Sequence, residues 1–144
     1  MPLSFDILPK VLKRAGYATH MLGKWHLGHF THVHTPAGRG FDKFFGFLFG
    51  SETHDSHNSW GQHTCSVPVI DLWNTSHRAD GSVHYKNMTY SPEMYGVEMD
   101  RLLRNHAAGT KAPFFLYMAF RACSQAACCR CRCGRHSCCC RACG

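Results

Sequence analysis

The order of helical and strand patterns in this sequence predicts an α/β layer fold. An amphipathic helix over residues 7–15 is followed at once by a strand over residues 17–22. A second helical pattern begins at Ser91, and a continuous apolar run over residues 113–120 comes after it. Helices that alternate with strands in this order pack on the faces of a mostly parallel sheet. With 144 residues, of which 44% are hydrophobic, the chain suits one modest domain with a core.

The first helix is predicted by apolar residues at helical spacing, which are Leu8, Val11, Leu12 and Ala15. Pro9 fits the first turn of such a helix, and Gly16 fits its end. Residues 17–22 then form the predicted strand, which we expect to end at Gly23 and to open a polar loop over residues 23–40.

The middle of the chain gives weaker signals. An aromatic cluster, for which we expect core packing, comprises Phe41, Phe44, Phe45, Phe47 and Phe49. Residues 50–66 are polar and rich in histidine, which indicates a loop. Residues 67–73 are a candidate strand, weakened by Pro68, and residues 74–90 are expected to be exposed.

The second helix is predicted to begin with Ser91 as its N-cap, followed by a first-turn proline and an acid. Residues that can share one face of this helix are Tyr95, Met99, Leu102, Leu103 and His106. Gly109 is a plausible end. Residues 114–120 read FFLYMAF, and this length and aromatic content favour a strand buried on both faces.

The composition changes after residue 122. Nine of the ten cysteines lie beyond that point, and residues 121–144 carry five arginines and no acid. The rest of the chain is nearly neutral, so the net charge of +7 is no argument for nucleic-acid binding. We therefore predict a folded part over residues 1–122 and a Cys/Arg-rich tail over residues 123–144 that is unstructured.

The tail permits two explanations. Cys128 and Cys131, like Cys140 and Cys143, have the two-residue gap found in zinc sites, so a metal-binding tail is one hypothesis. The favoured hypothesis is a frameshift or a mispredicted exon near residue 122, because alternating Cys and Arg arise when GC-rich coding sequence is read out of frame.

Lys24 and His26 are the candidate site residues. The predicted strand delivers them to a turn flanked by Gly23 and Gly28, and in an extended segment alternate side chains point the same way. A cation and an imidazole aimed at one point can bind an anion, while Trp25 between them would point away and pack. Taken alone, a lysine and a histidine in a loop are more often solvated side chains.

Several segments of the chain resemble the type I sulfatases, in particular members similar to arylsulfatase B. Residues 16–28 read GYATHMLGKWHLG and match the family signature Gly-Tyr-x-Thr-x-x-x-Gly-Lys-x-His. The similarity continues through residues 39–47 (RGFDKFFGF), residues 85–88 (YKNM) and residues 111–120 (KAPFFLYMAF). The resemblance implies an alkaline-phosphatase-like α/β sandwich, of which this chain would contain an interior part.

The resemblance also implies a chemistry, the hydrolysis of sulfate esters. The family's nucleophile is a formylglycine made from the cysteine of a Cys-x-Pro-Ser-Arg motif, and a calcium ion helps to hold the sulfate. By motif position, Lys24 would bind the sulfate substrate and neutralise charge as the leaving oxygen departs. His26 would hydrogen-bond the formylglycine hydrate and help discharge the sulfated intermediate.

The departures from the family pattern matter equally. The chain has no Cys-x-Pro-Ser-Arg motif, and it lacks the paired Asp ligands and the Asp-Asn pair that hold calcium in the family. The family pattern Phe-x-x-x-His would place an active-site histidine at position 124, which is Ser124 here. We therefore expect the chain to be inactive alone. The alternative function is a non-catalytic sulfatase-like domain that binds sulfated glycans.

The remaining expectations concern histidines, modification and location. Loop histidines that we expect at the surface, with no metal assigned to them, are His29, His32, His34, His54, His57 and His63. The sequons at Asn74 and Asn87 are candidate glycosylation sites. The family implies the secretory pathway, lysosomal or extracellular, although no signal peptide and no membrane-spanning run is visible.

Overall fold

A computed structural model describes most of the chain before residue 121. The described residues are 1–50, 52–54, 57–59, 69–75, 81–82, 90–109 and 111–120. The helices are α1 (Leu8–Arg14), α2 (Ser91–Gly109) and two short 3-10 helices, η1 (His32–His34) and η2 (Ala37–Arg39). The strands are β1 (Ala18–Lys24), β2 (Lys43–Phe47), β3 (Asn58–Ser59), β4 (Val69–Ile70), β5 (Trp73–Asn74), β6 (Gly81–Ser82) and β7 (Phe114–Ala119).

The main sheet has the strand order β6-β5-β2-β1-β7. The three longest strands are parallel to one another, with β1 between β2 and β7. The short strands β5 and β6 continue the sheet beyond β2 in antiparallel pairing. Parallel strands need helical or loop crossovers, which here are the 3-10 segment before β2 and helix α2 before β7.

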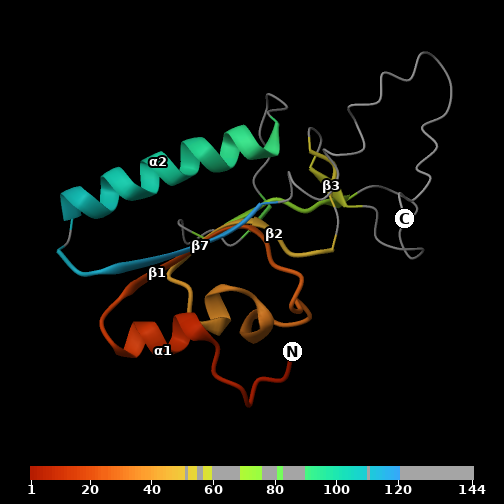
Figure 1. Cartoon of the computed structure of the whole chain (residues 1–144). Helices are drawn as coiled ribbons and strands as arrows, with labels where there is room; N and C mark the ends of the chain where they lie inside the picture. Colours follow the sequence, from red (N-terminus) through yellow and green to blue (C-terminus); the bar gives the residue numbers. More distant parts are fainter. Residues whose placement is uncertain are drawn as a thin grey trace, which may run out of the picture.

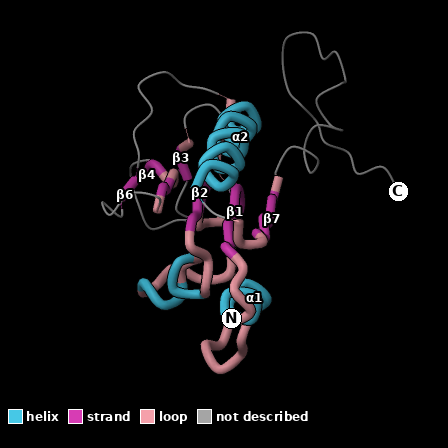
Figure 2. Tube along the Cα trace, turned by 90° about the vertical axis from the view of Figure 1, so that its left-hand side faces the viewer, coloured by secondary structure: helices cyan, strands magenta, loops and turns pink. Residues whose placement is uncertain are grey.

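Helices cover both faces of the sheet. Figures 1 and 2 show α2 along one face, and α1 with the two 3-10 helices on the other. Neighbouring residues of β1 point to opposite faces, so Met21 joins the core beside α1 and Leu22 joins the core beside α2. Phe44 and Phe45 of β2 divide in the same way. The predicted α/β layer fold is therefore confirmed.

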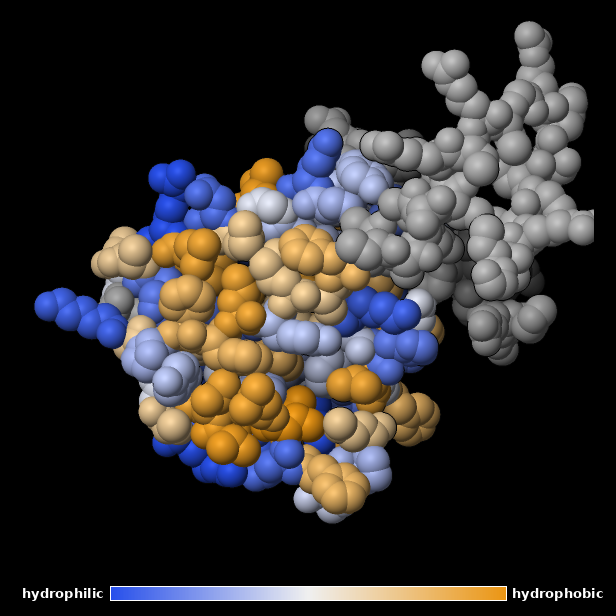
Figure 3. All heavy atoms as spheres, in the orientation of Figure 1, coloured by the Kyte–Doolittle hydropathy of each residue, from blue (hydrophilic) through white to orange (hydrophobic). Residues whose placement is uncertain are grey.

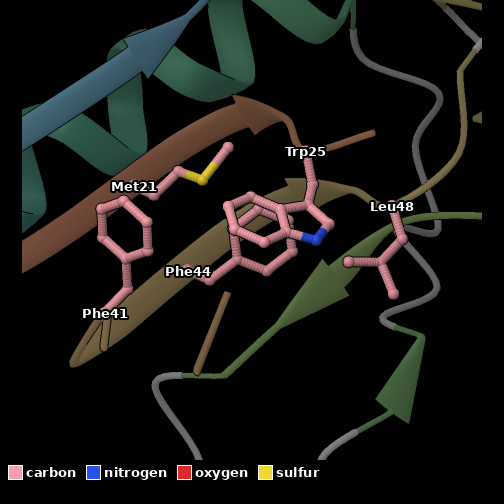
Figure 4. Close-up of a cluster of buried hydrophobic side chains, with 5 residues drawn as sticks. All are labelled: Met21, Trp25, Phe41, Phe44 and Leu48. Carbon is pink, nitrogen blue, oxygen red and sulfur yellow. The ribbon is translucent and has the colours of Figure 1, made fainter. Parts of the chain in front are cut away.

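The core on the α1 side is mainly aromatic. It consists of Met21, Trp25, Phe41, Phe44 and Leu48, drawn in Figure 4, and Ile7 packs against it. The rings of Trp25 and Phe41 meet edge to face with centroids 6.2 Å apart. The expected packing role of the aromatic cluster is confirmed for Phe41, Phe44, Phe45 and Phe47, which are buried, whereas Phe49 is only partly buried. The structure adds that Lys43–Phe47 form strand β2.

The prediction that the last strand is buried on both faces is wrong for this chain. β7 lies at the edge of the sheet and pairs only with β1 among the described strands. Its apolar side chains do pack onto both cores, through Phe115 on one face and Leu116 on the other. Phe114 and Tyr117 are nevertheless 42% and 48% exposed, because no described strand lies beyond β7. Figure 3 shows apolar side chains at the surface in the region of β7 and α1.

Helix α2 follows the prediction except at its first residue. Its buried face includes Tyr95 and Leu102, and Met99 packs against the same core, as expected. Ser91 is the first helical residue rather than a cap on its own helix. Its hydroxyl instead donates to the carbonyl oxygen of His54 at 2.9 Å, because the helix start is buried against that loop.

The predicted strand over residues 67–73 is divided into β4 and β5. The stretch expected to be exposed from residue 74 begins instead inside the sheet, since Asn74 is partly buried in β5. No helix among the described residues has both the length and the apolar character needed to span a membrane.

Candidate active site

Two neighbouring parallel strands end at one edge of the sheet, and the segments after them form the candidate site. Lys24, the last residue of β1, lies opposite Phe47, the last residue of β2. The contact continues past the strands: Trp25 N–H donates to Phe47 O at 2.9 Å, and His26 N–H donates to Leu48 O at 3.1 Å. Ligands of open α/β sheets bind beyond the carboxyl ends of the strands, which is where Lys24 and His26 lie.

Lys24 still belongs to the strand, whereas the sequence predicted the strand to end at Gly23. Gly23 instead pairs with both neighbouring strands and lets β7 approach closely, since a Cβ there would lie 2.3 Å from the carbonyl oxygen of Ala119. The Lys24 side chain is half-buried and makes no hydrogen bond or ion pair with another described residue. Its ammonium group can therefore bind an anion.

His26 does not follow the extended geometry that we predicted. Its backbone has φ 53°, in the left-handed region, so the side chains of Lys24 and His26 are not aligned by strand alternation. The chain turns here, and the exposed imidazole lies over Gly50. A Cβ at Gly50 would lie 2.8 Å from Nε2 of His26, so a larger residue at position 50 would displace the ring.

Trp25 holds the loop that follows the site. Its side chain is buried, as predicted, and its Nε1 donates to the carbonyl oxygens of Gly28 at 2.8 Å and His34 at 3.0 Å. A buried indole N–H usually finds such partners, and here it fixes the loop over residues 28–34 against the core.

Asp71 is a buried residue of this region that the sequence analysis missed. It is 1% exposed, and its carboxylate accepts from the backbone N–H groups of Leu48 at 3.1 Å and Phe49 at 2.8 Å and from Nε1 of Trp73 at 2.7 Å. Burial raises the pKa of Asp71, and the three hydrogen bonds act in the opposite direction. An acid between apolar Ile70 and Leu72 was the signal in the sequence.

The family model described as Sulfatase matches residues 1–133 of the chain. The chain belongs to the sulfatase family. The match extends past residue 122, where the composition changes, so the domain boundary at that residue stays a prediction.

Relatives of this sulfatase family member include arylsulfatases. It is 38% identical to mouse arylsulfatase J over 122 residues, which cover 85% of this chain and 19% of that protein. It is 34% identical to the arylsulfatase of Klebsiella aerogenes over 113 residues, which cover 76% of this chain and 22% of that protein. The chain thus spans about a fifth of the length of these sulfuric ester hydrolases. Because the matched relatives are arylsulfatases, the alternative of a non-catalytic glycan-binding domain is not favoured.

Solved structures support the same fold. The crystal structure of Ps i-CgsB in complex with k-i-k-neocarrahexaose matches with a TM-score of 0.66 and 27% sequence identity, over 85% of this chain and 28% of that one. The fold is therefore part of the alkaline-phosphatase-like α/β sandwich that the sulfatase signature implied.

The end of β7 reaches the same edge of the sheet. Ala119 pairs with Gly23, so the next residue, Phe120, lies beside Lys24. Ser124, the position at which the family pattern has a histidine, lies outside the described residues. Within the described ranges, no group of three or more His, Cys, Asp or Glu side chains could hold a metal ion. The residues described here therefore do not fit a calcium site.

The loop histidines are not all at the surface. His29 and His32 are exposed, as expected, and the ring of His29 packs on Phe49 with centroids 4.1 Å apart. His57 is 5% exposed, which contradicts the prediction, because it lies in a buried polar group with Glu52 and Ser91 at the start of α2. His63 lies outside the described residues.

Of the two sequon asparagines, only Asn74 lies among the described residues. Asn74 pairs with Phe45 in the sheet, and the Thr75 hydroxyl of the same sequon contacts the Phe44 backbone, accepting from N–H at 2.7 Å and donating to the carbonyl oxygen at 3.2 Å. Asn87 lies outside the described residues. The tail over residues 123–144, with its candidate zinc spacings, also lies outside them.

Proposed function

We propose that this chain supplies the Lys24–His26 part of a sulfate-ester site, with Lys24 as the residue that binds sulfate. The observation that carries the proposal is the position of Lys24: an ammonium group without an ion partner among the described residues, at the carboxyl end of strand β1. A charge-assisted hydrogen bond from an ammonium to a sulfate oxygen is stronger than a neutral one.

His26 complements Lys24 in this proposal. Its exposed imidazole can donate a hydrogen bond to a second sulfate oxygen or move a proton at the ester oxygen. The positive charge of Lys24 would oppose the negative charge that develops on the leaving oxygen.

The covalent step of ester cleavage is outside the proposal for this chain. Formylglycine requires a Cys-x-Pro-Ser-Arg motif, which the sequence lacks, and the described residues do not fit a calcium site. We therefore expect the 144-residue chain to bind sulfate without hydrolysing sulfate esters.

A sulfated sugar is the substrate class that the relatives favour. The related N-acetylgalactosamine-6-sulfatase of mouse is named for a sulfated amino sugar, and Ps i-CgsB is described in complex with neocarrahexaose. An exposed loop beside the half-buried Lys24 suits a polar glycan more than a buried apolar ligand.

Sulfate titration followed by NMR tests the function. We expect the side-chain signals of Lys24 and His26 to shift saturably, and Lys24→Met to weaken the affinity about tenfold, the loss of one charge-assisted hydrogen bond. Lys111→Met, which removes an exposed lysine on the loop before β7, is the matched control. Unchanged Lys24 and His26 signals, or release of a chromophore from an aryl sulfate by this chain, would overturn the proposal.

We also propose the secretory pathway as the location, since the family relatives favour it and two sequons are present. Expression in animal cells behind a secretion signal should give a glycosidase-sensitive product. Loss of that sensitivity in Asn74→Gln or Asn87→Gln would identify the modified residue, and a product that glycosidase leaves unchanged would contradict glycosylation.

A further inference from the structure

The backbone of His26 is held by the turn that follows β2. His26 N–H donates to the carbonyl oxygen of Leu48 at 3.1 Å, and the His26 ring lies over Gly50. The conformation of residues 48–50 therefore determines where the imidazole is presented. Any group that fixes this turn also fixes His26.

Asp71 binds the same turn through its carboxylate. Oδ1 accepts from Leu48 N–H and from the indole of Trp73, and Oδ2 accepts from Phe49 N–H. Two consecutive backbone N–H groups are thus held by one carboxylate, while the carbonyl oxygen of Leu48 accepts from His26. Leu48 is the residue that both Asp71 and His26 contact.

The chemistry of the three donors favours a carboxylate at position 71. An ionised carboxylate only accepts hydrogen bonds, and all three neighbours donate. An asparagine of the same shape would turn an NH₂ group toward one of these N–H donors and lose at least one bond. Asp71 is also held in place itself, because its backbone N–H donates to the carbonyl oxygen of His57 at 2.9 Å.

We infer that Asp71 is a positioning residue for His26, acting through the backbone of Leu48 and Phe49. This inference rests on the proposed function only for the role given to His26. Asp71 does not itself reach the solvent where sulfate would bind, since it is buried.

Asp71→Asn is the direct test, and Asp42→Asn is its matched control. Asp42 also anchors backbone, since its Oδ2 accepts from Thr19 N–H at 2.8 Å, but it does so near the other end of β1. We expect Asp71→Asn to raise the amide exchange rates of His26, Leu48 and Phe49 about tenfold and to shift the His26 ring resonances, as expected for loss of a buried charge-assisted bond. The Thr19 amide should keep its wild-type rate.

Asp42→Asn should give the reverse pattern, with faster exchange at Thr19 and unchanged His26 resonances. The inference is overturned if Asp71→Asn leaves the His26 ring and amide as in the wild type, or if Asp42→Asn moves them equally. Sulfate titration of the same samples separates the two proposals. If sulfate does not shift wild-type His26, the proposed function fails while the exchange result still decides the role of Asp71.

A second measurement needs no variant and covers the case in which Asp71→Asn does not fold. In the wild-type chain, the amides of His26, Leu48 and Phe49 should open as one unit, with the same dependence of exchange on urea concentration. Independent opening of His26 would show that the turn does not hold it, and would overturn the inference.

Discussion

Gly46 lies directly against the backbone of Gly23, and a Cβ at Gly46 would be 2.0 Å from the Gly23 carbonyl oxygen. The two glycines are partners in the parallel register of β1 and β2, one residue before each strand ends. This close approach brings the carboxyl ends of the strands together beneath Lys24. The glycines therefore shape the site without contacting a ligand.

Replacing Gly46 tests that relationship. Gly46→Ala should reduce the free energy of unfolding by about 2 kcal/mol or more, because the new methyl group meets backbone that cannot move aside. Gly96→Ala is the control, since a Cβ at this position inside α2 meets nothing within 4 Å. It should stabilise the chain by about 1 kcal/mol. Urea unfolding measures both, and equal effects of the two substitutions would contradict the close approach.

The buried His20 should make the fold sensitive to acid. His20 is 5% exposed, and neither ring nitrogen has a hydrogen-bond partner among the described residues. Burial lowers the pKa of His20 below 6.5, assisted by Lys43 and His106 and opposed by Asp42. The unfolded chain then binds the proton more readily than the folded one, so stability is complete above the unfolded pKa and falls as the pH drops below it.

We therefore expect the free energy of unfolding to decrease as the pH falls below about 6.5, the ordinary pKa of histidine. In His20→Leu, which places an apolar side chain in the same buried position, this part of the pH dependence should disappear. A slope that is identical in the wild type and in His20→Leu would show that His20 stays unprotonated in both states or is not buried.

The indole of Trp25 should be needed for the loop after the site. Trp25→Phe keeps an aromatic ring in the core but removes the donor to Gly28 O and His34 O. We expect a loss of about 1–2 kcal/mol in the free energy of unfolding, because the carbonyl groups of two partly buried residues lose a partner. Amide exchange should also become faster around His34, and unchanged protection there would contradict the assigned role.

The exposed edge at β7 should promote self-association. An edge strand with apolar side chains offers unpaired backbone groups to another chain. Tyr117→Lys places a charge on this strand, where Tyr117 is 48% exposed, and should reduce concentration-dependent association in sedimentation. Val97→Lys is the control, since Val97 is 72% exposed and belongs to helix α2 rather than to a strand. If both substitutions reduced association equally, the added charge rather than the β7 edge would be the cause, which would contradict the prediction.

Local patterns predicted the regular elements well. Helix α1, strand β1 and helix α2 were predicted within a few residues, because each has a clear apolar period and terminal signals. The site residues Lys24 and His26 came from a compact signature in one segment. Their catalytic roles stay predictions, and the structure corrects the geometry assumed for His26, which lies in a left-handed turn rather than an extended segment.

The sequence by itself determined the α/β class, the sulfatase family and the two candidate site residues, Lys24 and His26, because each of these features depends on a short contiguous segment. Only the tertiary structure decided that β7 is an edge strand, that His20 and His57 are buried, and that Asp71 holds the turn behind His26. Asp71 is far from Lys24 and His26 in the sequence. Its hydrogen bonds exist only after the sheet has brought residues 48, 49 and 71 together, and no local pattern contains that information.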